Sequence, residues 1–265
     1  MSKPVPLNVD TIKDGLKTRH IGREVLLYKT TASTNDIAWH YANNPENSGL
    51  AVFAEYQKAG RGRGDNKWLS DKKRSILCSI LLLDRGVQAE LLTITSAVAV
   101  AEAISKYSKA AGRIKWPNDV MINGKKVAGI LLESRVLGGK KSFVIGVGVN
   151  CHQKEDFFAG DEFQMPATSI DVENGPTVDR NALAADLLRT FDDYLAIAEE
   201  NAEVVTEHWR RLSSQLGHRV TLIYNRKQFS GNCIGIDPAK GLILQLDSGG
   251  VSIFDAAHTT ILKHN

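Results

Sequence analysis

The sequence predicts an α+β fold in which a mixed-sheet domain is followed by a small β-barrel. Up to about residue 214, apolar runs of strand length alternate with segments of helical periodicity. After Gly217 the pattern changes to five short alternating runs within about fifty residues, which is typical of a small barrel. We therefore expect one domain over residues 1–214 and a second over residues 215–265.

Composition narrows the class of protein. Hydrophobic residues make up 43% and charged residues 24%, the mix of an ordinary soluble globular protein, and the net charge of +3 is too small to indicate a nucleic-acid partner by itself. Three widely spaced cysteines argue against a disulfide framework and for a reducing compartment: Cys78, Cys151 and Cys233. We find no signal-peptide pattern and no apolar run of membrane-spanning length, so we expect a cytoplasmic protein without a membrane partner.

The first elements follow from caps and apolar spacing. A short helix is expected within residues 8–17, with Asn8 or Asp10 as its N-cap. Residues 24–30 predict a strand. Hydroxyl and amide residues followed by apolar positions at helical spacing predict a capped helix over residues 31–42.

Two near-continuous apolar runs, residues 50–56 and 75–83, predict strands that are covered on both faces. Between them, residues 58–73 are rich in glycine and charge without periodicity, which indicates a long loop, and loops of this length often carry function. A helix is expected over residues 90–111, with Gly112 at its end.

The pair Asn123-Gly124 is the strongest short signal for a hairpin turn, and it lies between the predicted strands 113–122 and 125–134. Another strand is expected over residues 143–150. Two helices should follow, one capped by Asp179 and running to about Glu200, the other over residues 204–212. The expected turns of the barrel are Asn225-Arg226, residues 237–241, Gly249-Gly250 and Ala256-Ala257.

The first candidate site is the loop from Gly60 to Gly64. Its glycines leave backbone N–H groups open, and the guanidinium groups of Arg61 and Arg63 can grip phosphate or carboxylate oxygens. The alternative is a solvated basic loop; a P-loop is excluded because no GK[ST] follows. Trp68 either stacks on a base nearby or serves as a core anchor.

The second and third candidates flank the hairpin. The segment from Lys115 to Asp119 places polar turn residues at the end of a strand. These residues either belong to a site or only form the turn. In a regular two-residue hairpin Lys126 would face Met121, and Asp119 would face Ala128. Asp119 and Lys126 then share one face of the sheet, either as a plain ion pair or as part of a site that also contains Gly129.

The fourth candidate is the segment from Gly146 to Asn150. Glycine inside a strand indicates close approach by a ligand or another backbone, or else tight packing against a helix. The sequence contains no HExxH or GxSxG motif, and its seven histidines are scattered. We therefore expect no metal site built from protein side chains.

Together these clusters resemble the biotin protein ligase family over nearly the whole chain. The matching segments are 33–35, 55–57, 60–63, 68–70, 115–119, 126–131 and 146–150. The resemblance implies a mixed-sheet catalytic domain followed by an SH3-like barrel. It also implies that biotin carboxylate attacks the α-phosphate of ATP to give biotinyl-5′-AMP, which a lysine of a biotin carboxyl carrier protein then attacks.

The resemblance also implies roles for individual residues. Catalytic roles fall to Lys126, Arg63, Asp119 and Lys115, of which Asp119 would orient or deprotonate the incoming lysine. The biotin site would comprise Ser33, Thr34, Asn35, Gln57, Gly60, Arg61, Gly62, Arg63, Lys126 and Gly129. ATP would lie near Arg63, Trp68, Asn118, Lys126 and Asn150, with Mg²⁺ held through phosphate oxygens and water.

The chain departs from the family at Asn66, where many bacterial members have a further arginine in the loop, so the motif does not say how a closed loop is locked. Some members also begin with a DNA-binding domain. About thirty residues precede Ser33, too few for a recognition helix, so we expect no DNA partner. A homodimer is possible. The alternative functions are a lipoate–protein ligase and a non-catalytic domain that docks carrier proteins.

Overall fold

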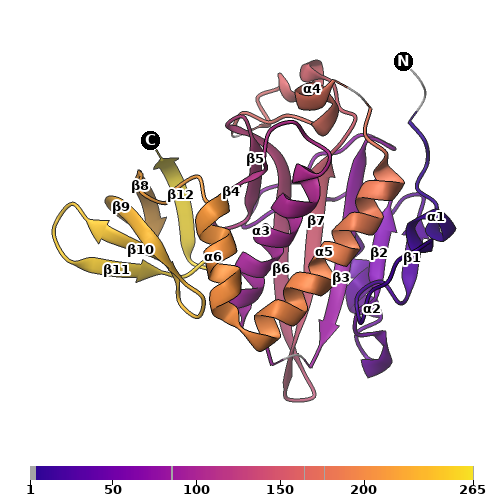
Figure 1. Cartoon of the computed structure of the whole chain (residues 1–265), viewed down its shortest axis with the longest axis horizontal. Coiled ribbons are helices and arrows are strands. Elements are labelled where there is room, and N and C mark those ends of the chain that lie inside the picture. The colour runs from indigo at the N-terminus through magenta and orange to yellow at the C-terminus, as the bar shows by residue number, and fades with distance from the viewer. Residues whose placement is uncertain (1–3, 85, 164, 176, 265) are drawn as a thin grey trace.

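The computed structural model describes residues 4–84, 86–163, 165–175 and 177–264, and it has the predicted α+β class (Figure 1). The larger sheet has seven strands in the order β1-β2-β3-β7-β6-β5-β4. Strands β1 and β2 run parallel and the other neighbours antiparallel, so the sheet is mixed. Its strands are β1 Val25–Tyr28, β2 Ala51–Ala54, β3 Ser75–Leu83, β4 Arg113–Lys115, β5 Asp119–Ile122, β6 Lys125–Leu137 and β7 Lys140–Asn150.

Helices cover both faces of this sheet. The long helices α3 and α5 pack together on one face with α6 beside them, whereas α2 packs against β2, β3 and β7 (Figure 1). The helical elements are α1 Val9–Lys13, α2 Thr34–His40, η1 Pro45–Asn47, α3 Ala89–Ser105, η2 Glu155–Phe158, α4 Ile170–Asn174, α5 Arg180–Glu200 and α6 Ala202–Leu212. The short elements η1, η2 and α4 were not predicted.

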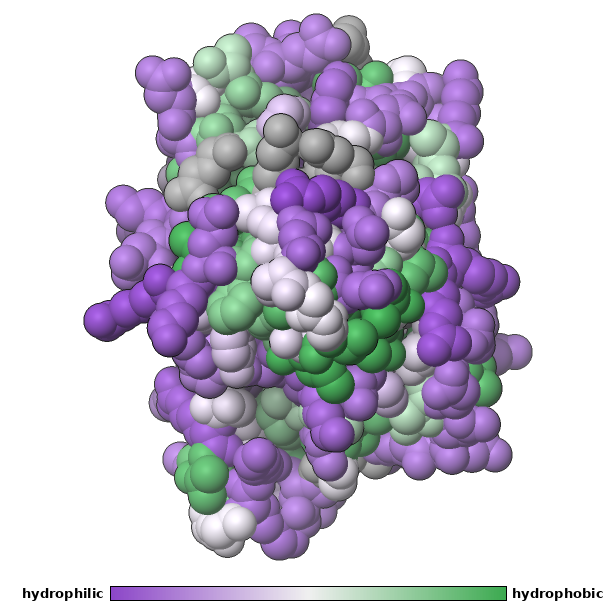
Figure 2. Space-filling view, turned by 90° about the vertical axis from the view of Figure 1, so that its left-hand side faces the viewer, coloured by the Kyte–Doolittle hydropathy of each residue, from purple (hydrophilic) through white to green (hydrophobic). Residues whose placement is uncertain are grey.

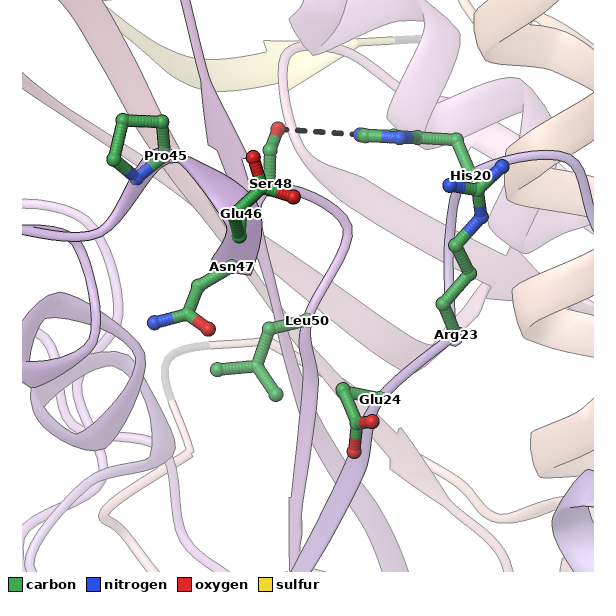
Figure 3. A pocket seen from close by; sticks show the side chains of 8 residues that line it. All are labelled: His20, Arg23, Glu24, Pro45, Glu46, Asn47, Ser48 and Leu50. Carbon is green, nitrogen blue, oxygen red and sulfur yellow. Dashed lines mark hydrogen bonds between the residues drawn. The ribbon is translucent and has the colours of Figure 1, made fainter.

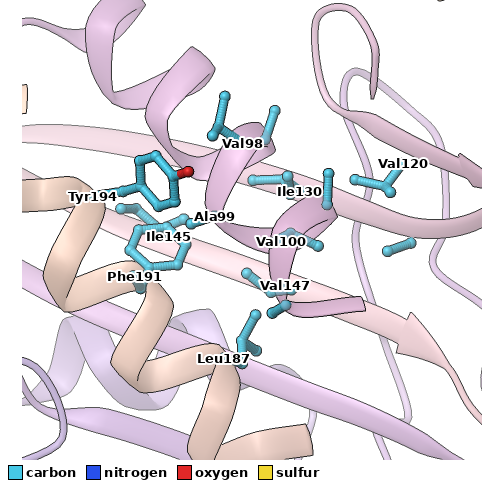
Figure 4. Close-up of a cluster of buried hydrophobic side chains, with 14 of the residues drawn as sticks. Val98, Ala99, Val100, Val120, Ile130, Ile145, Val147, Leu187, Phe191 and Tyr194 are labelled. Atoms are coloured by element: carbon cyan, nitrogen blue, oxygen red, sulfur yellow. The ribbon is translucent and has the colours of Figure 1, made fainter. Parts of the chain in front are cut away.

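Alternation along the central strands separates two cores. In β7, Ile145 and Val147 point toward α3 and α5 and pack with side chains such as Val98 and Phe191 (Figure 4). In β3, Leu81 and Leu83 point the other way, into the smaller core beneath α2. Full burial of each such side chain stabilises the fold by about 1.5–3 kcal/mol. The face beneath α2 also carries polar and glycine positions, and these form the site described below.

The predicted helix caps are confirmed at two positions. The Asn8 side chain accepts from Thr11 N at 2.9 Å, and the Asp179 side chain accepts from Asn181 N at 2.8 Å. The predicted end of α3 at Gly112 is wrong, because the helix ends at Ser105. The chain turns back there, and Gly112 N donates to Ser105 Oγ at 2.9 Å.

The predicted strand 113–122 is split at Pro117, which lacks an N–H group, into β4 and β5. Lys126 faces Met121 as predicted, but the predicted pairing of Asp119 with Ala128 is wrong: Asp119 pairs with Gly129. The reason is a β-bulge between Val120 and Met121, which shifts the register by one residue.

The five predicted C-terminal strands form a separate antiparallel sheet in the order β11-β10-β9-β8-β12, consistent with a small SH3-like domain. It packs against α6 through β9. Its strands are β8 Arg219–Tyr224, β9 Lys227–Asp237, β10 Gly241–Leu246, β11 Val251–Phe254 and β12 Thr259–His264. Figure 2 faces this side of the molecule, where apolar and polar residues are interspersed. The division at residues 214 and 215 remains a prediction.

No helix within the described ranges is both long enough and apolar enough to cross a membrane.

Candidate active site

The predicted site residues gather on the sheet face that lies beneath α2. Ser79 pairs with Gly146, and Gly148 pairs with Gly129, which in turn pairs with Asp119. Paired residues share a face, and so do residues two apart in one strand, so all five lie on the same side of the sheet. The strand register therefore brings three of the candidate segments, those around Asp119, Gly129 and Gly146, onto one surface.

A buried polar cluster occupies one end of this face. Thr34, at the start of α2, donates from its backbone N and its hydroxyl to Gln57 Oε1, at 2.7 and 3.0 Å. The hydroxyl of Ser79 lies 2.6 Å from both Thr34 Oγ1 and Asn35 Oδ1. Ser33 is buried beside them. Ser79 was missed by the sequence reasoning, although a serine in the middle of an otherwise apolar strand was the available signal.

The amide of Asn35 is only half used. Its Oδ1 accepts from Ser79, whereas its Nδ2 is buried without a hydrogen-bond partner among the described residues. A buried donor without a partner costs free energy, about 1–3 kcal/mol, which a ligand oxygen would recover. The cluster thus suits a ligand that carries a carbonyl group and N–H groups close together.

Two close approaches explain the glycines of β6 and β7. A Cβ added at Gly148 would lie 2.6 Å from Trp68 Cζ2 and 2.7 Å from Trp68 Nε1, and one at Gly129 would lie 2.9 Å from Trp68 Cζ3. A Cβ at Gly146 would lie 2.5 Å from Asn35 Oδ1. The sequence analysis offered two explanations for these glycines, close approach by a ligand or another backbone, or packing against a helix. In the structure, the side chains of Trp68 and Asn35 lie directly against them.

The predicted loop around Gly60 to Gly64 is closed on itself as a small hairpin. Trp68 N donates to Gly60 O at 3.0 Å, and Gly62 N donates to Asn66 O at 2.7 Å. Gly60 is required here, because a Cβ would lie 2.5 Å from Trp68 O. Asn66, the residue that departs from the family motif, therefore closes the turn through its backbone, and Trp68 is held against the sheet.

The charged end of the face centres on Lys126. Its Nζ lies 2.5 Å from Asp119 Oδ1 and 5.8 Å from the centroid of the Trp68 ring, so the predicted shared face is confirmed. Burial lowers the pKa of nearby Lys115, and Lys126 lowers it further, while Asp119 acts in the opposite direction. The backbone of Lys126 pairs with the segment 166–168, a contact that the sequence did not indicate.

Arg63 contacts the C-terminal barrel. Its Nη2 donates to the main-chain oxygens of Ala256 and, at 2.9 Å, of Thr259. Glu90, at the start of α3, holds the same turn by accepting from Ala256 N at 3.0 Å. Burial lowers the pKa of Arg63 and raises that of Glu90. Asp119, another predicted catalytic residue, lies close enough to Arg63 for its charge to raise the pKa of the guanidinium against the effect of burial.

Two asparagines that we predicted to lie near the nucleotide donate hydrogen bonds from their side-chain amides to the main chain around the site. Asn118 Nδ2 donates to Ile130 O at 2.9 Å, and Asn150 Nδ2 donates to Thr168 O at 3.0 Å. Arg61 contacts the acidic side chains of Asp36 and Glu133. The ligand roles assigned to these residues from the sequence remain predictions.

Another pocket lies at the opposite end of the parallel strands. This pocket of about 150 Å³ opens where β1 and β2 begin, and in its lining the side chain of His20 is hydrogen-bonded to Ser48 (Figure 3). Gln57 of the candidate site, by contrast, follows the end of β2. The lining of the pocket contains none of the predicted site residues: His20, Arg23, Glu24, Pro45, Glu46, Asn47, Ser48 and Leu50. We therefore place the candidate active site on the sheet face rather than here.

Comparisons with known proteins identify the family. A family model described as the biotin/lipoate A/B protein ligase family matches residues 27–150. The "Bifunctional ligase/repressor BirA" of Bacillus spizizenii is 32% identical over 97% of this chain and 80% of its own length. The "Biotin--[acetyl-CoA-carboxylase] ligase" of Paracoccus denitrificans is 33% identical over 83% of this chain and 93% of its own.

A solved structure shows the same fold. The Aquifex aeolicus biotin protein ligase, in complex with biotin and ATP, superposes with a TM-score of 0.78 at 24% identity, and the match covers 91% of this chain and 99% of that one.

Proposed function

This chain belongs to the biotin/lipoate A/B protein ligase family, and from that premise we propose that it activates biotin with ATP and transfers it to one lysine of a biotin carboxyl carrier protein. The observation that carries the proposal is the single sheet face that joins the buried polar cluster at Asn35 to the charged pair Lys126–Asp119. The carrier would be a domain of a biotin-dependent carboxylase.

The polar cluster suits the ureido ring of biotin. That ring presents one carbonyl oxygen and two N–H groups, which need donors and acceptors held at fixed spacing. Asn35 Nδ2 is a buried donor with no partner in the described chain, and Thr34 and Gln57 supply a hydroxyl and an amide oxygen beside it. The backbone of Gly60 to Gly62, next to Gln57, would close over the ring.

The charged end suits the first half-reaction. A carboxylate oxygen of biotin attacks the α-phosphorus of ATP, the bond from that phosphorus to its bridging oxygen breaks, and pyrophosphate leaves. Two anions must meet, so cations at the junction lower the barrier. Lys126 would supply one such cation, and Lys115 lies close enough for their charges to interact. Trp68, between the two ends, would lie against the nucleotide.

Mg²⁺ would accompany ATP and neutralise phosphate charge, held mainly by phosphate oxygens and water. Where the chain is described, no three histidine, cysteine or acidic side chains cluster as metal ligands.

The second half-reaction needs a neutral amine on the carrier. Asp119 would take the proton of the incoming lysine once substrate phosphates compete for its partner, Lys126. The amine then attacks the carbonyl carbon of biotinyl-5′-AMP, an amide bond forms, and AMP leaves. Arg63 would also contact the adenylate, and in this structure its Nη2 donates to the main-chain oxygens of Ala256 and Thr259.

The test is exchange of labelled pyrophosphate into ATP with biotin, with lipoate and with neither acid. We expect exchange that depends on biotin. Exchange with lipoate alone would identify a lipoate–protein ligase. If neither acid supports exchange but a carrier domain still binds, the chain is a docking module and the proposal is wrong.

A further inference from the structure

The side chain of Arg61 forms a bidentate contact on the rim of the site. Its Nη1 and Nη2 donate to the two carboxylate oxygens of Asp36, at 3.0 and 2.8 Å, and its Nη2 and Nε donate to Glu133 Oε1, at 3.0 and 3.3 Å. The contact with Asp36 is the main reason why the pKa of Arg61 is raised above its ordinary value. One guanidinium therefore joins the glycine loop to α2 and to β6.

One of the two acidic partners, Glu133, is itself anchored. The second oxygen of Glu133 accepts from Trp39 Nε1 at 2.8 Å, and the guanidinium of Arg135 lies 4.4 Å from the Trp39 ring centroid. Trp39 is buried in the smaller core between α2 and the sheet. Trp39 thus links the contact between Arg61 and Glu133 to the smaller core.

The three joined segments are those that carry the proposed biotin site. Asp36 follows Asn35 directly in α2, Arg61 lies between Gly60 and Gly62, and β6 carries both Glu133 and Gly129. A rigid bicyclic ring is recognised only if its donors and acceptors keep fixed spacing. The pair Arg61–Asp36 adds a side-chain link between α2 and the loop, whose start is also bonded through Ala59 N to Ala32 O at 3.0 Å.

We infer that Asp36 and Glu133 are positioning residues for biotin, which act through Arg61 by holding the glycine loop at a fixed distance from the Asn35 amide. This inference rests on the proposed function. ATP would bind at the other end of the sheet face, near Lys126 and Trp68, so the contacts of Arg61 with Asp36 and Glu133 act on biotin binding more than on ATP binding.

The test compares Asp36→Asn and Glu133→Gln in the pyrophosphate-exchange assay. We expect each change to raise the KM for biotin about fivefold, which corresponds to about 1 kcal/mol, the upper range for a partly exposed ion pair. The KM for ATP, kcat and the melting temperature should stay near wild type. Arg61→Lys should resemble Asp36→Asn, because an ammonium keeps the charge but loses the planar fork.

The matched control is Asp247→Asn, which removes an exposed pair with Arg219 in the barrel. The side chains of Arg219 and Asp247 are 55% and 46% exposed, close to the 40% and 50% of Arg61 and Asp36. This control should leave both KM values unchanged. Added salt screens exposed pairs, so the KM ratio of Asp36→Asn to wild type should shrink as salt rises.

The outcomes separate the two claims. Wild-type exchange that does not depend on biotin overturns the proposed function and this inference together. Biotin-dependent wild-type exchange with an unchanged KM for biotin in both Asp36→Asn and Glu133→Gln overturns the inference alone. The inference is also overturned if the KM values for biotin and ATP rise equally, because the ion pair of Arg61 and Asp36 would then support the fold in general. If Asp36→Asn folds poorly, Glu133→Gln decides by the same criteria.

Discussion

Gly146 and Gly148 lie two residues apart on one face of β7, yet alanine at each should impair binding of a different substrate. At Gly148 the added methyl would lie 2.6 Å from Trp68 Cζ2, against an ordinary carbon–carbon contact of about 3.5–4.0 Å, so the indole must retreat by about 1 Å. At Gly146 the methyl would lie 2.5 Å from Asn35 Oδ1, so the amide must move instead.

The expected magnitudes follow from these contacts. Overpacking by one methyl costs about 1–3 kcal/mol, and Trp68 cannot adapt freely because its backbone N is bonded to Gly60 O. Displacing Asn35 would break its hydrogen bond with Ser79, a loss of about 0.5–1.5 kcal/mol. At roughly 2–4 °C per kcal/mol, the melting temperature should fall by several degrees in Gly148→Ala and by less in Gly146→Ala.

The assay measures KM for each substrate in the exchange reaction, together with the melting temperature. We expect Gly148→Ala to raise the KM for ATP and Gly146→Ala to raise the KM for biotin. Gly235→Ala is the control, because its Cβ would lie 3.9 Å from Ile243 Cδ1, an ordinary contact. The reasoning is refuted if both β7 variants raise the two KM values in the same proportion, or if Gly235→Ala has the same effect.

Two further predictions concern the lysines of the site. Lys126→Met should slow adenylate formation by roughly 10²–10³, the usual cost of removing a preorganised donor, as measured in single-turnover experiments; a normal rate would show that Lys126 serves only as the ion-pair partner of Asp119. Burial lowers the pKa of Lys115 in the folded protein below its unfolded value of 10.5. At a pH between the folded and unfolded pKa values, Lys115 is protonated in the unfolded chain but not in the folded protein, so wild-type stability rises with pH in this range. Urea unfolding should show this rise in wild type and not in Lys115→Met, and identical pH profiles would contradict it.

Local chemistry made much of the fold predictable. Asn8 and Asp179 were identified as caps because their side chains can accept from the first free N–H groups of a helix. Asn123 has φ of 50° and Gly124 has φ of 75°, a turn geometry that this dipeptide favours. The five barrel strands were predictable for the same reason, since each is bounded by residues suited to turns.

The site was only partly predictable, because its decisive contacts join distant segments. The bulge that places Gly129 opposite Asp119 shifts a register that a regular turn would have set, and no single residue type signals it. Arg63 reaches Thr259, almost two hundred residues away in sequence. Nothing near Arg63 could have indicated this contact, since its acceptors belong to a turn of the second sheet.

The acceptors of Arg63 on the barrel are main-chain oxygens, which every amino acid carries. Side-chain replacement at positions 256 and 259 therefore leaves this contact intact, provided that the path of the turn is kept. Barrel sequences could diverge widely among relatives while each continued to hold its loop arginine in the same way. A comparison of sequences would then record variable positions where a comparison of structures would find a shared contact, and only a change of backbone, such as an insertion in the turn, would break it.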